Sequence, residues 1–302
     1  MAVEWIEIAR AKVNLALHVG GLRDDGYHPV ATVVQKLALH DELVIRVEPR
    51  SSGDLAIRIS ADRPGVPTGP ENLAWRAVEL LKAELRAKGY GRAAVLIHIR
   101  KRIPVAAGLG GGSADAAAVL AGFNRRLGLG LSLEALLEKA AALGSDVPAC
   151  LIDGAALCTG RGEKVRPIAS PMLWWVLAHP GGRLSTADVY KAFDALREVG
   201  SSKSESDLAE EVAPLVSALA CQGVAQVARY LYNDLQEAAS RLHSGIAPLL
   251  AEMRAQGAIN ALVSGSGPTV AGVMPDARTA RRAAEALQGK GFWVWWGFSH
   301  AS

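Results

Sequence analysis

The feature that most constrains this chain is a glycine-rich connection between a predicted strand and a predicted helix, in residues 104–120. Residues 94–100 alternate between apolar and other side chains, as a half-buried strand does, and Pro104 ends that pattern. Glycine occupies positions 108, 110, 111 and 112, where a backbone without Cβ atoms can adopt positive φ angles and approach a ligand closely. The alanine-rich sequence that follows favours a helix, which we expect to begin near Ser113 with unpaired N–H groups. Such a helix end attracts phosphate.

Two common glycine motifs do not match this loop. A Walker loop ends in Gly-Lys-Ser or Gly-Lys-Thr, whereas Gly112 is followed directly by Ser113. The dinucleotide fingerprint needs glycine at position 113, where this chain has serine. A connection that only allows close helix packing is the alternative, but three consecutive glycines are costly to order unless the bare backbone is used. We therefore favour phosphate binding by a loop of another kind.

Length and charge limit the classes of function. The chain has 302 residues, enough for two domains with separate cores, and 50% of them are hydrophobic, as in ordinary globular proteins. The formal net charge is only +3, which gives no strong case for binding nucleic acid or an acidic membrane surface. We expect neither partner.

The cysteines and the N-terminus favour a reducing compartment. Cys150, Cys158 and Cys221 form no CxxC pair, which argues against a disulfide framework and against a zinc site. Glu4 and Glu7 lie where a signal peptide needs basic residues and then an apolar run. No uninterrupted apolar segment is long enough to span a bilayer. The cytoplasm is the expected location.

The first predicted strand places polar side chains on one side. Alternation puts one set of residues on an apolar side, namely Val13, Leu15, Leu17 and Val19, and the other set opposite, namely Lys12, Asn14, Ala16 and His18. For an average lysine, a solvated face is the ordinary explanation. The apolar setting on both sides of Lys12 instead favours a lysine that meets an anion.

Two further places offer functional side chains, and the residues alone leave both open. Tyr27 and His28 follow turn residues 20–26, so their rings could stack on a planar ligand, although exposed turn aromatics without a role are common. Asp146 lies between a predicted helix end at Gly144 and a proline. A turn or cap aspartate is the commoner outcome there, and a carboxylate near the phosphate loop is the alternative.

The remaining sequence predicts alternating strands and helices. An antiparallel sheet is expected from strands at 31–39, 42–48 and 55–59. Asn72 and Ser132 are expected to cap helices, and the second of these ends at Gly144. A hairpin is expected at 155–159 and 163–168, followed by a boundary near 170. Beyond it we expect strands at 174–178, 261–264, 269–274 and 292–298, and helices that begin at 185 or 186 and that span 208–219, 224–242, 246–256 and 277–287. A surface loop is expected at 200–207 and a second glycine loop at 265–268.

Three motifs together resemble the family of galactokinase, homoserine kinase, mevalonate kinase and phosphomevalonate kinase. They are Ala11-Lys12-Val13-Asn14-Leu15, Gly108-Leu109-Gly110-Gly111-Gly112-Ser113 and Ser264-Gly265-Ser266-Gly267. Two more, Gly26-Tyr27-His28 and Gly144-Ser145-Asp146-Val147-Pro148, are most similar to the members that act on 4-diphosphocytidyl-2-C-methyl-D-erythritol. The resemblance extends over residues 7–273, and its specificity lies in the combination of motifs in this order.

The resemblance implies an α+β fold with two domains. Residues 1–169 would form an ATP-binding, catalytic domain like the second domain of ribosomal protein S5, and residues 170–302 a ferredoxin-like domain that completes the substrate cleft. The implied reaction transfers the γ-phosphate of ATP to the 2-hydroxyl of the cytidyl substrate, on the non-mevalonate route to isoprenoids. ATP and Mg²⁺ are the implied cofactors, and a small-molecule substrate is the implied partner of a monomer or weak homodimer.

The resemblance also implies roles for individual residues. Asp146 would orient and deprotonate the hydroxyl, and Lys12 would stabilise charge on the carboxylate and on the moving phosphoryl group. The implied ATP-binding set is Pro104, Val105, Ala106, Ala107, Gly108, Leu109, Gly110, Gly111, Gly112, Ser113 and Ala114, with Asn72 and Lys101 near the adenine. The implied substrate-binding set is Asn14, Tyr27, His28, Ser264, Gly265, Ser266 and Gly267, with Tyr27 and His28 at the cytosine. Ser113 is the candidate hydroxyl for Mg²⁺.

Other classes of function remain as alternatives. Another small-molecule alcohol kinase of the same family would share the glycine loops but would not need Tyr27 and His28. A nucleotide-binding module without catalysis would bind nucleotide without turnover. A nucleic-acid binder with an S5-like domain would need a basic face, which a net charge of +3 does not support.

Overall fold

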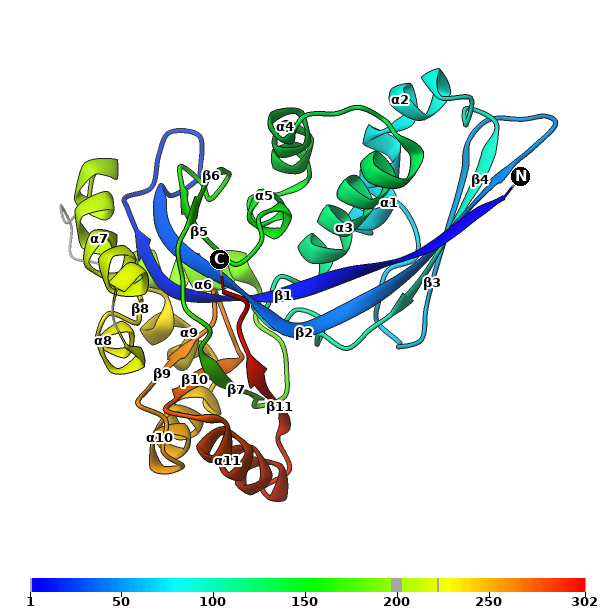
Figure 1. The fold of residues 1–302 in the computed structure, drawn as a ribbon. Helices are drawn as coiled ribbons and strands as arrows, with labels where there is room; N and C mark the ends of the chain where they lie inside the picture. The colour runs from blue at the N-terminus through cyan, green and yellow to red at the C-terminus, as the bar shows by residue number, and fades with distance from the viewer. Residues whose placement is uncertain (1, 197–202, 222, 302) are drawn as a thin grey trace. The chain divides into compact units, whose positions relative to one another are not determined.

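The computed structural model describes residues 2–196, 203–221 and 223–301 (Figure 1). Contacts divide the chain into two compact units that are not continuous in sequence. The first unit contains Met1–Ala11, Leu39–Val105 and Gly110–Leu151, and the second contains Lys12–Ala38, Ala106–Leu109 and Ile152–Ser302. This grouping differs from a division at residue 169, which stays a prediction about domains. Within the described ranges, no helix has the length and apolar character that crossing a membrane requires.

The first unit is a sheet with helices packed on it. Its strand order is β3-β4-β2-β1, from β3 (Ala56–Ala61), β4 (Ala93–Arg100) and parts of β2 (Val30–Pro49) and β1 (Val3–Val19). Its helices are α1 (Leu73–Leu80), α2 (Lys82–Ala87), α3 (Gly111–Leu127), α4 (Leu133–Leu143) and α5 (Val147–Leu151). In Figure 1, α1, α3 and α4 lie on one side of these strands. Apolar side chains of the strands and helices form one core between them.

Local sequence decides where these helices begin. Asn72 caps α1, as predicted, because its Oδ1 accepts a hydrogen bond from Ala74 N at 2.8 Å. Ser132 caps α4 in the same way, as predicted. Helix α3 begins at Gly111, two residues before Ser113, because Gly110 has a φ of 69° and precedes the helix as its N-cap. The first turn of α3 therefore contains two glycines and leaves its N–H groups open on that side.

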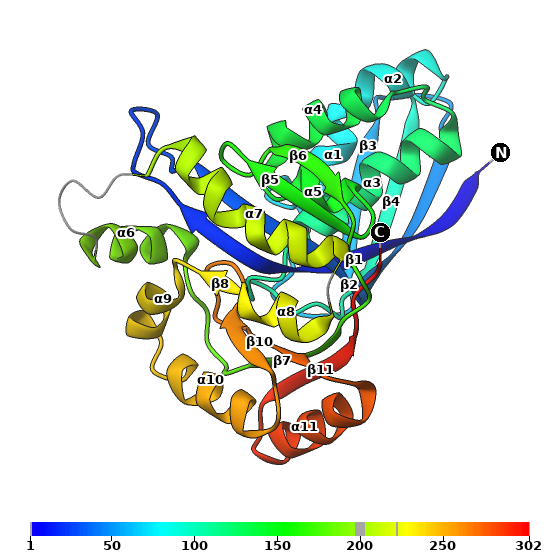
Figure 2. The same cartoon turned by 60° about the vertical axis from the view of Figure 1, so that its left-hand side comes forward.

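The second unit contains the remaining part of the seven-stranded sheet and a separate four-stranded sheet. The other parts of β1 and β2 pair with β8 (Tyr232–Asn233) and with the hairpin of β5 (Ala155–Thr159) and β6 (Lys164–Ile168). A four-stranded sheet has the order β11-β7-β10-β9, from β7 (Trp174–His179), β9 (Asn260–Val263), β10 (Val270–Met274) and β11 (Trp293–Phe298). The helices are α6 (Thr186–Leu196), α7 (Glu205–Cys221), α8 (Val224–Arg229), α9 (Gln236–Leu242), α10 (Ile246–Ala255) and α11 (Ala277–Gly289). Helices α10 and α11 pack on the four-stranded sheet (Figure 2). The α+β class is confirmed.

Several predicted elements are wrong in detail. The strands expected at 31–39 and 42–48 are one strand, β2, because the backbone stays extended through His40 and Asp41. The sheet is mixed, since β3 pairs with β4 in parallel and β1 pairs with β8 in parallel. The helix expected at 224–242 is α8 and α9 with β8 between them. In the loop expected at 200–207, residues 200–202 lie outside the described residues and α7 already begins at Glu205.

We expect Phe123→Ala to destabilise the protein by about 3–5 kcal/mol, because it leaves a cavity in the core of the first unit. Phe123 on α3 is fully buried, and its ring meets the edge of the Trp5 ring at a centroid distance of 5.4 Å. Urea denaturation measures the free energy of unfolding. Leu133→Ala is the control, because Leu133 is 48% exposed and should change stability by less than about 0.5 kcal/mol. Equal effects of the two substitutions would contradict this assignment of the core.

Candidate active site

Two glycine loops meet within the second unit. In the first loop, Gly108 has a φ of 77°, and its carbonyl accepts a hydrogen bond from Ser264 Oγ at 3.0 Å. A Cβ atom at position 108 would lie 2.2 Å from the carbonyl oxygen of Ser264, which no side chain tolerates. In the second loop, Gly265 and Gly267 have φ angles of 57° and 81°. Glycine is therefore required where the two loops approach each other.

Lys12 and Asn14 face these loops from β1. Lys12 N donates to Leu109 O at 3.0 Å, and its Nζ donates to Asn14 Oδ1 at 2.7 Å. Asn14 Nδ2 donates in turn to Thr32 Oγ1 at 2.9 Å, which fixes the orientation of the Asn14 amide. A Cβ at Gly265 would lie 3.3 Å from Asn14 Oδ1 and 3.5 Å from Lys12 Nζ. One ammonium group and one amide are thus held against the second glycine loop.

Strand β1 has the predicted alternation, but the side of the strand that carries Lys12 and Asn14 is buried and not solvated. Lys12 is 5% exposed and Asn14 is 3% exposed. Burying an ammonium group is costly unless hydrogen bonds and charges compensate for the water it loses. The structure therefore excludes the ordinary explanation of Lys12 as a solvated surface lysine.

Asn233 holds the second glycine loop in place and was not predicted as part of the site. Its Nδ2 donates to the carbonyls of Val263 at 2.7 Å and of Gly265 at 2.8 Å, and its Oδ1 accepts from Leu235 N at 2.9 Å. Asn233 lies on β8, in register with Leu17 of β1. One buried amide therefore links the strand register of β1 to the position of the loop. In the sequence, the only signal was an Asn-Asp pair that interrupts a helical pattern.

The glycine loop continues into the first turn of α3. Ala106 has a φ of 56°, a left-handed conformation that favours glycine. Gly112 is exposed, and a Cβ built there meets no atom within 4 Å. Ala114 N donates to Gly110 O at 2.8 Å, so the regular helical hydrogen bonds begin there. The N–H groups of Gly111, Gly112 and Ser113 precede that bond, so the helix itself offers them no carbonyl partner, and phosphate binding at this helix end stays a prediction.

Lys101 is buried in an ion-paired cluster. Its Nζ lies 2.7 Å from Asp41 Oδ2 and 2.6 Å from Asp115 Oδ2. Burial raises the pKa of Asp115 to about 7; Lys101 opposes that rise and Asp41 adds to it. Burial by itself would lower the pKa of Lys101, but the carboxylates of Asp115 and Asp41 raise it above its usual value.

Asn72 uses both ends of its amide within the protein. Its Oδ1 caps α1, and its Nδ2 donates a hydrogen bond to Pro67 O at 2.6 Å. A role near adenine stays a prediction for both Lys101 and Asn72.

Asp146 is exposed and immediately precedes the short helix α5 in the first unit. Its carbonyl oxygen accepts a hydrogen bond from Cys150 N at 3.3 Å, so Asp146 opens the first helical turn. The structure thus gives Asp146 the cap position that the sequence offered as one of two alternatives. Its catalytic role stays a prediction, because Lys12 belongs to the other unit.

Tyr27 and His28 lie in one loop but have different surroundings. The Tyr27 ring is 52% exposed and has the Arg161 guanidinium 4.8 Å from its centroid. His28 is buried, and its Nδ1 donates to Gly20 O at 2.9 Å. The His28 ring stacks on Tyr190 at 5.2 Å, and its Nε2 lies 3.3 Å from Asp194 Oδ2. Tyr190 and Asp194 were missed because their spacing on α6 is that of any amphipathic helix.

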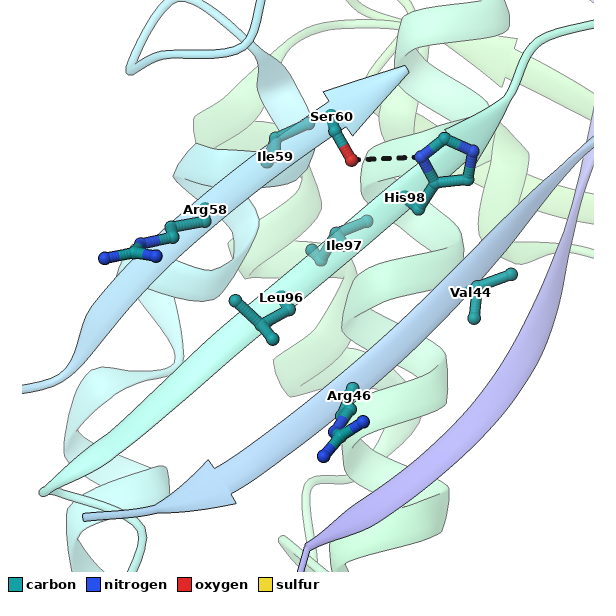
Figure 3. Close-up of a pocket in the computed structure, with 8 residues that line it drawn as sticks. All are labelled: Val44, Arg46, Arg58, Ile59, Ser60, Leu96, Ile97 and His98. Atoms are coloured by element: carbon teal, nitrogen blue, oxygen red, sulfur yellow. Dashed lines mark hydrogen bonds between the residues drawn. The ribbon is translucent and has the colours of Figure 1, made fainter. Parts of the chain in front are cut away.

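A separate hollow of about 450 Å³ lies on the sheet of the first unit (Figure 3). Its walls come from β2, β3 and β4, and Ser60 Oγ lies 3.0 Å from His98 Nδ1 there. None of the predicted site residues lines this hollow. Across the described part of the chain, no group of three or more His, Cys, Asp or Glu side chains is placed to hold a metal ion.

Comparison with known proteins gives two family matches and close relatives. Residues 72–154 match the model of the GHMP kinases N terminal domain, and residues 210–292 match that of the GHMP kinases C terminal domain. A 4-diphosphocytidyl-2-C-methyl-D-erythritol kinase from a Synechococcus species is 43% identical over 95% of this chain and 92% of its own length. The protein of the same name from Moorella thermoacetica is 42% identical over 93% of each chain.

Solved structures agree with the family matches. A crystal structure of 4-(cytidine 5'-diphospho)-2C-methyl-D-erythritol kinase has a TM-score of 0.77 and 36% identity, covering 99% of this chain and 100% of that one. Homoserine kinase from Cytophaga hutchinsonii has a TM-score of 0.72, covering 98% of this chain and 95% of its own, and at 18% identity it is similar in fold alone. The resemblance read from the three sequence motifs is confirmed: the chain belongs to the GHMP kinase family and is a small-molecule kinase.

Proposed function

We propose that this chain transfers the γ-phosphoryl group of ATP to the 2-hydroxyl of 4-diphosphocytidyl-2-C-methyl-D-erythritol, in the non-mevalonate route to isoprenoid precursors. The relatives that are about 40% identical over nearly the whole chain carry the name of this kinase. Their shared name supports the choice of substrate. The choice of reaction also rests on the geometry of the site.

One observation carries the proposal: the buried Lys12 ammonium and Asn14 amide lie against the second glycine loop, at the place where that loop meets the first. Phosphoryl transfer requires mainly positioning and neutralisation of charge and little covalent chemistry from the protein. Backbone N–H groups freed by glycine and a fixed ammonium group supply these two requirements. A site for nucleophilic or redox chemistry would need other groups.

We assign the steps as follows. The loop from Pro104 to Gly110 and the first turn of α3 hold the triphosphate of ATP. The substrate hydroxyl oxygen forms a bond to the γ-phosphorus, the bond from that phosphorus to the β–γ bridging oxygen breaks, and ADP leaves. Asp146 accepts the hydroxyl proton, and a strong base is not needed because that proton leaves late in a loose transition state. Lys12 stabilises negative charge on the phosphoryl oxygens.

The remaining predicted residues have supporting roles in this proposal. The Ser113 hydroxyl on the first turn of α3 would offer an oxygen ligand to Mg²⁺ bound together with ATP, and the ion would supply positive charge against the phosphates. Tyr27 and His28 hold the cytosine. Asn14 and the loop from Ser264 to Gly267 place the substrate alcohol. We infer that the enzyme acts in the cytoplasm without nucleic acid, as a monomer or weak homodimer.

A panel of alcohols tests the proposed reaction. We expect ADP release with ATP and Mg²⁺ from 4-diphosphocytidyl-2-C-methyl-D-erythritol, and none above background from its uncytidylated phosphate, mevalonate, homoserine or galactose. A coupled ADP assay measures turnover on each compound. Turnover on another alcohol would remove the cytosine site and keep the kinase. ATP binding without turnover on any of them would contradict the proposed reaction.

We expect Asp146→Asn to lower kcat by about 100-fold or more, with nucleotide affinity little changed, because the amide cannot accept the hydroxyl proton. Steady-state kinetics and a separate measurement of ATP binding distinguish these effects. Asp153→Asn is the matched control, since the Asp153 carboxyl is fully exposed and paired with Lys36 at 3.4 Å. Near-normal turnover of Asp146→Asn would exclude Asp146 as the base.

Tyr27→Ala is expected to raise the KM for the cytidyl substrate more than it lowers kcat, because a stacking ring contributes to binding before and during the reaction alike. Tyr230→Ala is a suitable control, because Tyr230 is another exposed tyrosine, with 43% of its surface accessible. The kinetic constants of both variants are measured with the same substrate. A fall in kcat at constant KM would count against stacking.

A further inference from the structure

The loop that carries Tyr27 and His28 joins β1 to β2 and has a closed base. Gly20 N donates to Pro29 O at 2.7 Å, and Gly20 O accepts a hydrogen bond from His28 Nδ1 at 2.9 Å. One of the two bonds at the base of the loop is therefore made by a side chain. Wherever the His28 imidazole is held, the loop from Gly20 to Pro29 is held with it.

Helix α6 contacts this imidazole with three side chains from one face. Tyr190, Phe193 and Asp194 have the i, i+3, i+4 spacing that places residues on the same side of a helix. The Tyr190 ring stacks on the imidazole at a centroid distance of 5.2 Å, and the Phe193 ring makes a T-shaped contact at 6.3 Å. The Asp194 carboxylate completes the set, with its Oδ2 3.3 Å from Nε2.

The two nitrogens of the imidazole have different partners. A carbonyl oxygen only accepts hydrogen bonds, so Nδ1 carries the proton in the bond to Gly20. An ionised carboxylate also only accepts, so the contact of Nε2 with Asp194 is favourable when Nε2 carries a proton too. Both nitrogens then donate, and Asp194 supplies the balancing negative charge. Among the three contacts from α6, that of Asp194 is the one made by charge.

The unequal burial of the two partners gives this contact more weight than an ordinary surface ion pair. The His28 side chain is 5% exposed, whereas the Asp194 side chain is 39% exposed. An ion pair between two exposed side chains contributes little, because water competes for both charges. Water has little access to the imidazole here, so removing the carboxylate deprives a buried nitrogen of a partner that solvent does not readily replace.

We propose that Asp194 is a positioning residue for the cytidyl substrate: it holds the His28 imidazole, and with it the loop from Gly20 to Pro29, against α6. The inference rests on the proposed function, which assigns Tyr27 and His28 to the cytosine. Asp194 takes no part in the transfer of the phosphoryl group. It fixes the loop before the substrate arrives, so that less binding free energy is lost in ordering the loop.

Steady-state kinetics of Asp194→Ala test this role. We expect the KM for 4-diphosphocytidyl-2-C-methyl-D-erythritol to rise by about fivefold or more, while kcat and the KM for ATP change less than about twofold. Asp194 is partly exposed on a helix and alanine favours helices, so the variant should fold, which thermal melting checks. Asp188→Ala removes an exposed carboxylate from the same helix and is the control. Equal effects of the two substitutions, or a fall in kcat at constant KM, would overturn the proposal.

The variant His28→Asn shows whether Asp194 acts through His28. The asparagine amide nitrogen takes the place of Nδ1 and can keep the bond to Gly20, but this shorter side chain lacks the Nε2 atom that meets Asp194. In the His28→Asn background we expect Asp194→Ala to change the KM less than about twofold, because both substitutions break the same contact. A full further loss would show that Asp194 acts by another route.

Trypsin cleavage tests the position of the loop without any ligand. Arg23 lies in the loop with 46% of its side chain exposed. If Asp194 holds the loop, cleavage after Arg23 should be about fivefold faster in Asp194→Ala than in the wild type or in Asp188→Ala, as mass spectrometry of the fragments would show. Equal cleavage rates would overturn the proposal. Wild-type protein that neither binds nor phosphorylates the cytidyl substrate would contradict the proposed function, and the cleavage rates would still decide whether Asp194 holds the loop.

Discussion

The close backbone approach of Gly108 to Ser264 is the contact on which the proposed site depends. No residue with a Cβ can occupy position 108, because that atom would lie 2.2 Å from the Ser264 carbonyl oxygen. The approach lets the Ser264 hydroxyl bond to the Gly108 carbonyl and brings the second loop to Asn14 and Lys12. Segments that are 156 residues apart in the sequence thus form one surface. The chemistry that we propose for this surface requires that close approach.

The two buried lysines, Lys12 and Lys101, each have polar or charged partners. The Lys12 ammonium is oriented by an amide, which is in turn fixed by Thr32, so its position on β1 is determined by hydrogen bonds. The Lys101 ammonium lies between two carboxylates and is not available to a ligand. One buried ammonium is thus bonded to a neutral amide and the other to two carboxylates. Rigid placement of charge before a ligand binds is what phosphoryl transfer requires from a protein.

Local patterns predicted much of the fold and the site motifs, and they failed where distant segments decide. The Asn72 and Ser132 caps, the hairpin of β5 and β6 and the glycine loop depend on neighbouring residues, and all are present. The single long strand β2 and the parallel pairing of β3 with β4 depend on tertiary contacts, which alternation does not encode. Asn233, Asp41 and Asp115 were missed for the same reason, since each acts on a segment far away in the sequence.

The parallel pairing of β1 with β8 has a consequence for the order in which the chain is made. Val19 N donates to an Asp234 carboxylate oxygen 215 residues later, and the strand that carries Lys12 pairs with β8 in the same region. A ribosome must therefore synthesise most of the protein before that strand meets its partner. Until then Ala16 and Leu17 of β1 lack their partner strand, and the hydrogen bond from Val19 to Asp234 cannot form.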